Sequence, residues 1–154
     1  MRWAELDLDK ALWRLPGERT KNGRPHDVPL PSQAVELLRA AGPGEGGGGE
    51  FVFGRRGFGA WNRGKARLDA ALGLPPWTLH DLRRTAVTGM AELGVAPHVV
   101  EAVVNHVSGH KAGVAGVYPR AVYAAEKRAA LQRWADHLDH VLGLAERKVI
   151  PLRA

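Results

Sequence analysis

The sequence predicts an α+β fold that is mostly α-helical, with a small antiparallel β-sheet packed on one side of a helical bundle. Two observations support this. A β-favourable run and a hairpin signal occupy the N-terminal third, whereas apolar residues recur at helical spacing from Thr78 onward. The chain has 154 residues, of which 45% are apolar, so we expect residues 1–154 to form one domain with a real core.

The N-terminal part is expected to form the sheet. Residues 11–15 are a short β-favourable run. The pair Asn22-Gly23 is the strongest short hairpin signal, because both residues tolerate the positive φ of a type I′ turn. Residues 20–21 and 24–30 would flank this turn, which places Lys21 at a shoulder of the hairpin.

The middle of the chain alternates between short elements and loops. Ser32 is expected to cap a helix whose apolar positions lie within residues 35–38. Residues 42–49 are glycine-rich but lack the Gly-Lys-Ser/Thr of a phosphate loop, so they predict a flexible connection. A short buried strand is expected at Phe51–Phe53, and a helix from about Trp61 to Leu72.

The rest of the chain is predicted to be mostly helical. Thr78 and Asp81 fit a capping box. The helix that they open has an apolar stripe made of Leu79, Leu82, Ala86, Met90 and Leu93. Gly94 would end this helix, and Pro97 suits the first turn of the next one. The last helix is expected at about residues 121–142, with one side made of Leu131, Trp134, Leu138 and Val141.

The composition excludes several classes of protein. The absence of cysteine excludes a disulfide scaffold, a cysteine-based zinc site and a thiol nucleophile, and it fits a cytoplasmic protein. No apolar run approaches the roughly 18 residues of a membrane span, and the N-terminus does not resemble a signal peptide. The net charge of +6 and the pI of about 10.2 favour a polyanionic partner, although many basic proteins bind no nucleic acid.

Five polar side chains stand out from the rest of the sequence. Lys21 lies beside the predicted turn, and His80 and Arg83 are three residues apart, which places them on one face of a helix. His106 follows a predicted helix, and Tyr118 lies beyond a glycine-rich segment. Each of these residues taken alone is more often an ordinary surface side chain.

Together with their neighbours, these residues resemble a known family. The segments TKNGRPH (20–26), VPL (28–30), WTLHDLRRT (77–85), VNH (104–106) and GVYPR (116–120) closely resemble the catalytic domain of tyrosine recombinases of the bacteriophage-integrase type. The similarity is strongest to integrases encoded by prophages and genomic islands. Any one segment would be a weak signal, but five in order are a strong one.

The resemblance implies site-specific DNA recombination without a metal, another cofactor or ATP. The tyrosine hydroxyl attacks a DNA phosphodiester, giving a 3′-phosphotyrosine link and a free 5′-hydroxyl, and a partner strand's 5′-hydroxyl then rejoins the DNA. The implied partners are double-stranded DNA and further copies of the full-length protein, as a tetramer on DNA.

The resemblance also implies a role for each of the five residues. Tyr118 is the nucleophile, and because a free tyrosine has a pKa near about 10, it needs cationic neighbours or a base. Arg83 and His106 would stabilise the charge that grows on the phosphorane-like transition state. His80 would assist proton movement at the tyrosine, and Lys21 would protonate the departing 5′-oxygen.

Other basic residues are candidates for contacts with the DNA backbone, namely Arg84, Arg24, Arg120 and Lys111. Several alternatives stay open. Tyr123 is the second candidate nucleophile, although it more often packs at a helix start. His106 and His110 are four apart, which could suggest a metal site, but no third ligand is obvious. The whole chain could also be a non-catalytic DNA-binding remnant, or a histidine-based metallohydrolase.

One part of the family pattern is absent from this sequence. The family's first catalytic arginine lies on a helix before the stretch that residues 1–9 resemble, and Arg2 comes too late in the pattern to replace it. We therefore expect an N-terminally truncated catalytic domain that lacks the N-terminal DNA-binding domain. Losing one such donor should lower the rate by about 10²–10³, so this chain alone should recombine DNA poorly.

Overall fold

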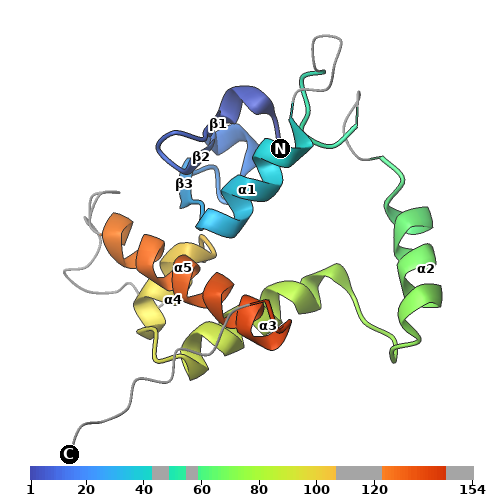
Figure 1. Cartoon of the computed structure of the whole chain (residues 1–154). Coiled ribbons are helices and arrows are strands. Elements are labelled where there is room, and N and C mark those ends of the chain that lie inside the picture. Colours follow the sequence, from blue (N-terminus) through green and yellow to red (C-terminus); the bar gives the residue numbers. More distant parts are fainter. Residues whose placement is uncertain (43–48, 55–58, 107–122, 145–154) are drawn as a thin grey trace, which may run out of the picture.

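The computed structural model describes residues 1–42, 49–54, 59–106 and 123–144. The described elements follow the order 3₁₀ helix η1 (Trp3–Glu5), β1 (Leu6–Asp7), β2 (Leu12–Leu15), 3₁₀ helix η2 (Gly17–Arg19), β3 (His26–Pro29), α1 (Ser32–Ala41), α2 (Trp61–Leu72), α3 (Leu79–Glu92), α4 (Pro97–Val103) and α5 (Ala124–Val141). In Figure 1 the strands and α1 form one part, α3, α4 and α5 form a second, and α2 stands apart from both. The chain is therefore mostly helical with a small sheet, as predicted.

The sheet has three antiparallel strands in the order β1-β2-β3. Leu6 pairs with Trp13, and Leu12 and Leu15 pair with Pro29 and His26. α5 contacts β3 as well as α3 and α4, so this last helix joins the sheet to the helical part. The small antiparallel sheet predicted from the sequence is confirmed.

The turn that joins β2 to β3 differs from the prediction. Residues 16–25 form a long connection that contains η2, and Thr20 and Lys21 lie in this loop rather than in a strand. Gly23 has a positive φ of 68°, but Asn22 does not, and a type I′ turn requires both. The loop instead folds onto itself, because a Cβ on Gly17 would lie 2.5 Å from the Gly23 carbonyl oxygen. The tight Asn-Gly hairpin was a wrong prediction.

Two further local predictions need correction. Ser32 is the first residue of α1, and Pro31 occupies the cap position without a side-chain bond. The Gln132 side chain of α5 accepts from the Ser32 backbone N–H at 3.0 Å instead. Phe51 forms a single antiparallel bridge with Arg2, so residues 51–53 are not a strand. Most of the glycine-rich segment 42–49 lies outside the described residues.

The capping signals of α3 and α4 are confirmed, and the apolar stripe of α3 is only partly buried. Thr78 and Asp81 form the capping box, and Pro97 is the first residue of α4. Met90 of the stripe is 1% exposed, but Leu79 and Leu82 are 46% and 59% exposed. Helical spacing predicts that these leucines share one side of α3, but it does not predict whether another element covers the first turns of the helix.

The last helix begins at Ala124, with Tyr123 at its cap position, and residues 121–122 lie outside the described residues. Its buried residues are Lys127, Ala130 and Ala135. Of the predicted apolar side, Trp134 packs against the helical core, whereas Leu138 and Val141 are largely exposed. This side of α5 is therefore only partly covered by the core.

Two apolar clusters stabilise the described part of the chain. The helical cluster consists of Met90, Val99, Val100 and Ala130, and Trp134 packs against it. The sheet cluster consists of Leu30, Leu38 and Val52, with Trp3 and Trp13 packed against it. Within the described ranges, no helix is both long enough and apolar enough to cross a membrane.

Candidate functional site

The loop of residues 16–25 presents Lys21 and Arg24, whose side chains are both exposed. Its shape is fixed by Thr20, whose hydroxyl oxygen lies 2.9 Å from the Gly17 carbonyl oxygen and 2.8 Å from the Arg24 carbonyl oxygen, so its single proton can be donated to either. The Gly23 N–H closes a turn onto the Thr20 carbonyl at 3.2 Å. Lys21 therefore projects from an ordered loop.

This loop contacts the C-terminal end of α4. The Asn22 side-chain amide donates to Asn105 Oδ1 at 3.1 Å and to the Asn105 carbonyl oxygen at 3.3 Å, across a separation of 83 residues. Asn105 has a positive φ of 52°, a conformation that asparagine tolerates better than most residues. The His106 N–H then bonds back to the Glu101 carbonyl at 3.0 Å, which ends the helix. Lys21 and His106 are thus each next in sequence to one member of a bonded asparagine pair.

Arg83 is joined to the same helix end. Its Nη2 donates to the Val104 carbonyl oxygen at 2.6 Å, and His26 Nε2 lies 2.9 Å from the Val103 carbonyl oxygen. The last carbonyls of a helix have no partner within it, so they readily accept such bonds. Three consecutive carbonyls, from Val103 to Asn105, thereby receive side chains from β3, α3 and the 16–25 loop. The end of α4 is the point where predicted site residues from distant parts of the sequence meet.

His80 lies one turn before Arg83 on α3 and is exposed. The neighbouring Asp81 accepts the Thr78 backbone N–H, and this bond, with that of the Thr78 hydroxyl, holds the pKa of Asp81 below its usual value. Arg84 forms an exposed ion pair with Asp81 at 3.4 Å. Since an exposed pair contributes little to stability, Arg84 stays available to other anions.

His26 is half-buried at the centre of this arrangement. Burial lowers the pKa of His26, and the charges of Lys127 and Arg83 lower it further. A neutral imidazole that bonds to a carbonyl oxygen must donate, so its proton lies on Nε2. Lys127 is itself buried and donates to the Asp27 carbonyl oxygen, and burial lowers the pKa of Lys127. Lys127 therefore ties α5 to β3 beside the site.

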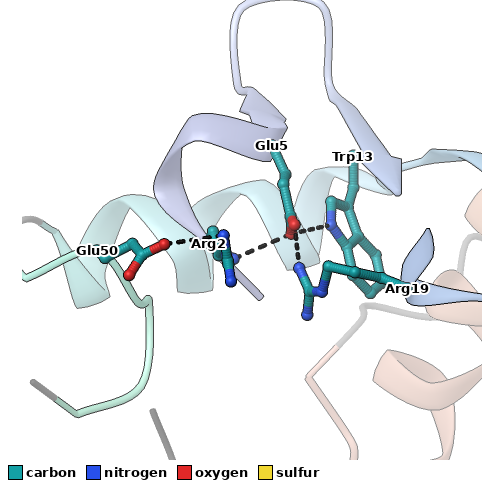
Figure 2. Close-up of polar contacts among 5 residues, drawn as sticks. All are labelled: Arg2, Glu5, Trp13, Arg19 and Glu50. Carbon is teal, nitrogen blue, oxygen red and sulfur yellow. Dashed lines mark hydrogen bonds and ion pairs between the residues drawn. The ribbon is translucent and has the colours of Figure 1, made fainter. Parts of the chain in front are cut away.

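A second polar cluster anchors the start of the same loop (Figure 2). The Glu5 carboxylate accepts bonds from the Arg19 guanidinium, from Trp13 Nε1 at 3.0 Å and from the Arg2 backbone N–H at 3.1 Å. Burial opposes ionisation of Glu5, but these donors together outweigh it and lower its pKa. Arg2 also pairs with Glu50 at 2.9 Å. Glu5 thus holds η2, two residues before Lys21, against the N-terminal segment.

Part of the predicted site falls within residues 107–122. Tyr118, Arg120, Lys111 and His110 lie outside the described residues. Tyr123 is the cap residue of α5, where its ring contacts the His98 ring at a centroid distance of 5.2 Å. Among the described residues, no group of three or more histidine, aspartate or glutamate side chains could hold a metal ion.

Sequence reasoning missed Asn22 and Asn105 as site residues, and it gave His26 no definite role. Local signals existed for two of them, because Asn22 adjoins Lys21 and Asn105 adjoins His106 in the quoted segments. Asparagine after a helix is also a common residue for the left-handed conformation. That the two asparagines bond to each other follows only from the tertiary structure.

Comparison with known proteins gives consistent results. Over 139 residues the chain is 36% identical to prophage integrase IntA of Escherichia coli, covering 88% of this chain and 33% of that protein. It is 35% identical over 145 residues to prophage integrase IntZ of the same species, covering 92% and 35%. A shufflon-specific DNA recombinase of Escherichia coli is 34% identical over 112 residues, covering 72% and 27%. The chain therefore spans about a third of the length of these relatives.

No solved structure matches the chain significantly. The model of the phage integrase family matches residues 1–115, which include the 16–25 loop, α3 and the end of α4. Because this match covers most of the chain and agrees with the relatives, the protein belongs to the phage integrase family.

Proposed function

We propose that this chain supplies the DNA-cleaving site of a tyrosine-type site-specific recombinase. The observation that carries the proposal is the meeting of the Lys21 loop, Arg83 and the His106 segment at the end of α4, in a member of the phage integrase family. Relatives of the chain are prophage integrases and a shufflon-specific DNA recombinase, which supports the same reaction class.

The electrostatics of the site suit a phosphodiester. Within the described part of the chain, neither Lys21, Arg24 nor Arg83 forms an ion pair with a carboxylate. Arg83 donates to a neutral carbonyl oxygen, which orients the guanidinium and leaves its charge uncompensated. A preorganised cation of this kind stabilises negative charge that develops in a transition state.

In the proposed reaction the Tyr118 oxygen attacks the phosphorus and the bond to the 5′-oxygen breaks. The tyrosine proton leaves with help from His80, and the 5′-oxygen takes a proton from Lys21. Arg83 and His106 donate to the non-bridging oxygens. In the rejoining step a 5′-hydroxyl attacks the phosphotyrosine. A DNA phosphodiester forms, the bond to the tyrosine oxygen breaks, and the tyrosine is restored. Each step exchanges one phosphoester bond for another, so the reaction needs no external energy source.

The proposed partner is double-stranded DNA, with Arg24, Arg84, Lys111 and Arg120 touching the backbone and a tetramer as the recombining unit of the complete protein. Phosphate contacts position the protein without reading sequence.

The test is covalent attachment to DNA. The chain is mixed with a pool of duplex fragments of the source organism's DNA, the mixture is denatured, and protein that stays attached is quantified. Because this chain alone is expected to react slowly, attachment is followed over long incubations. We expect slow attachment with the wild type and with Tyr123→Phe, and none with Tyr118→Phe, whose DNA affinity should stay nearly unchanged. DNA affinity without attachment in the wild type would overturn the proposal and favour a non-catalytic DNA-binding protein.

A further inference from the structure

A general acid contributes only when its proton is held close to the departing atom. Displacement by about 1 Å can lower a rate by about 10²-fold. Lys21 lies on an exposed loop and its ammonium is carried on a flexible stem, so the backbone position of this loop sets what the proton can reach. Something must therefore fix the loop relative to Arg83 and His106.

Asn22 makes contacts both within the 16–25 loop and with the end of α4. Its Oδ1 accepts the Arg24 backbone N–H at 3.1 Å and lies 3.1 Å from the Thr20 hydroxyl oxygen, and both contacts are inside the loop. Its Nδ2 donates out of the loop, to Asn105 Oδ1 at 3.1 Å and to the Asn105 carbonyl at 3.3 Å. The Asn22 side chain thus fixes the backbone next to Lys21 relative to the end of α4.

Asn105 occupies the matching position on the other side. It lies between Val104, whose carbonyl holds Arg83, and His106, whose N–H closes the helix end. Its left-handed backbone conformation is what turns the chain there. The bond from Asn22 therefore reaches a segment that also orients Arg83 and carries His106.

We propose that Asn22 and Asn105 form a positioning pair that places Lys21 to protonate the leaving 5′-oxygen. The inference rests on the proposed function, and both asparagines act through their neighbours instead of touching the DNA. An amide suits this role because it donates and accepts without charge, whereas a carboxylate at the same place would attract the Lys21 ammonium and repel a phosphate.

The test compares two substrates and two isosteric variants. Asn22→Asp keeps the acceptor oxygens that shape the loop but loses the Nδ2 donor to Asn105. Asn105→Asp adds the same negative charge to the same pair of side chains. It keeps Oδ1 as the acceptor for Asn22 and loses only the bond of 3.5 Å from Asn105 Nδ2 to Asn22 Oδ1. It therefore serves as the charge-matched comparison. Thermal unfolding checks that both variants fold.

Cleavage is measured on a DNA site found in the attachment experiment, made once with the normal 5′-oxygen and once with sulfur in its place. A thiol has a pKa of about 8.5, so a thiolate departs without a proton and makes the general acid dispensable. We expect Asn22→Asp to slow cleavage of the oxygen substrate by about 10- to 100-fold and, on the sulfur substrate, to approach the rate of Asn105→Asp, which carries the same added charge. Lys21→Ala should show the same pattern, and Asn105→Asp a smaller loss.

Equal losses of Asn22→Asp on both substrates would overturn the inference, since they would mean general damage to the site. Unchanged cleavage of the oxygen substrate would overturn it as well. If the wild type cleaves neither substrate, the proposed function itself fails and the inference with it. The wild-type rates thus test the function, and the ratio between the two substrates tests the positioning pair.

Discussion

A single glycine allows the two long helices of the core to approach each other. A Cβ built on Gly89 of α3 would lie 2.1 Å from Cζ3 and 2.7 Å from Cη2 of Trp134 on α5. The Trp134 ring also stacks on His137 at a centroid distance of 5.5 Å, which limits its freedom to move away. Gly89 therefore has a packing reason to stand inside a helix where glycine is otherwise unfavourable.

We predict that Gly89→Ala lowers the free energy of unfolding. Alanine gains up to about 1 kcal/mol in helix propensity, but overpacking costs up to about 3 kcal/mol, so a net loss of about 1–2 kcal/mol is expected. Urea unfolding measures it. Thr88→Ala, at the exposed neighbouring position, is the control and should not destabilise the chain. An unchanged midpoint for Gly89→Ala would mean that Trp134 can rearrange.

His26 should make stability depend on pH in a definite direction. Its pKa in the folded chain lies below the value of about 6.5 of an unfolded histidine, mainly because of burial. As pH falls below about 6.5, the unfolded chain takes up a proton before the folded one, so unfolding becomes easier until the folded-state pKa is passed.

His26→Gln should remove this component, because glutamine can still donate to the Val103 carbonyl but does not titrate. The measurement is the difference in unfolding free energy between wild type and variant across pH 5–8, which cancels the other histidines. A difference that does not change with pH would contradict the assignment of a lowered pKa to His26.

At the scale of whole elements, α5 caps α1. Gln132 Oε1 accepts the Ser32 N–H at 3.0 Å, and its Nε2 donates to Ser32 Oγ at 3.1 Å and to Asp136 Oδ1 at 2.8 Å. The side chain of one helix thereby satisfies a free N–H at the start of another. Asp136, which accepts from Gln33 and Gln132, has a lowered pKa for that reason.

We predict that Gln132→Ala lowers the free energy of unfolding by about 0.5–2 kcal/mol, the usual range for losing a helix cap. Gln132→Glu, made together with Asp136→Asn so that no second carboxylate faces it, retains an acceptor for the Ser32 N–H and should lose less at neutral pH. Chemical unfolding followed by circular dichroism gives both values. Equal losses in the two variants would show that the Nε2 donor, and not the cap, is what stabilises the contact.

Local signals predicted the elements that local chemistry controls. The bounds of α2 at Trp61 and Leu72, the Thr78–Asp81 capping box and Pro97 in the first turn of α4 all follow from neighbouring residues. The tight Asn22-Gly23 turn failed because Gly17 packs against the Gly23 carbonyl, a contact that no turn propensity contains. Leu82 is exposed, so periodicity predicted which residues share a face of α3 but not whether another element covers that face.

The same division holds for the site. The types and order of Lys21, His80, Arg83 and His106 were readable from the sequence by resemblance. The pairing of Asn22 with Asn105 spans 83 residues and requires the folded chain. The roles of these residues in cleavage stay predictions, and Tyr118 lies outside the described residues.

At the scale of the whole molecule, α2 differs from the other helices. It stands apart from the strands and from α3 to α5 (Figure 1), and it contains no buried residue. Leu68 and Leu72 are 43% and 50% exposed on it. Exposed apolar residues that gather on one element favour association between molecules. They contribute less to the stability of the single chain than buried leucines do, because about half of their surface stays in contact with water after folding.

The double variant Leu68→Gln, Leu72→Gln should therefore separate stability from association. We expect its free energy of unfolding to stay within about 0.5 kcal/mol of wild type, as for surface substitutions generally. Met90→Ala, at a residue that is 1% exposed, should lose about 2–5 kcal/mol and serves as the core reference. Sedimentation at rising protein concentration should show less association for the double variant. A large loss of stability in it would mean that α2 packs on the rest of the chain more closely than its exposed leucines indicate.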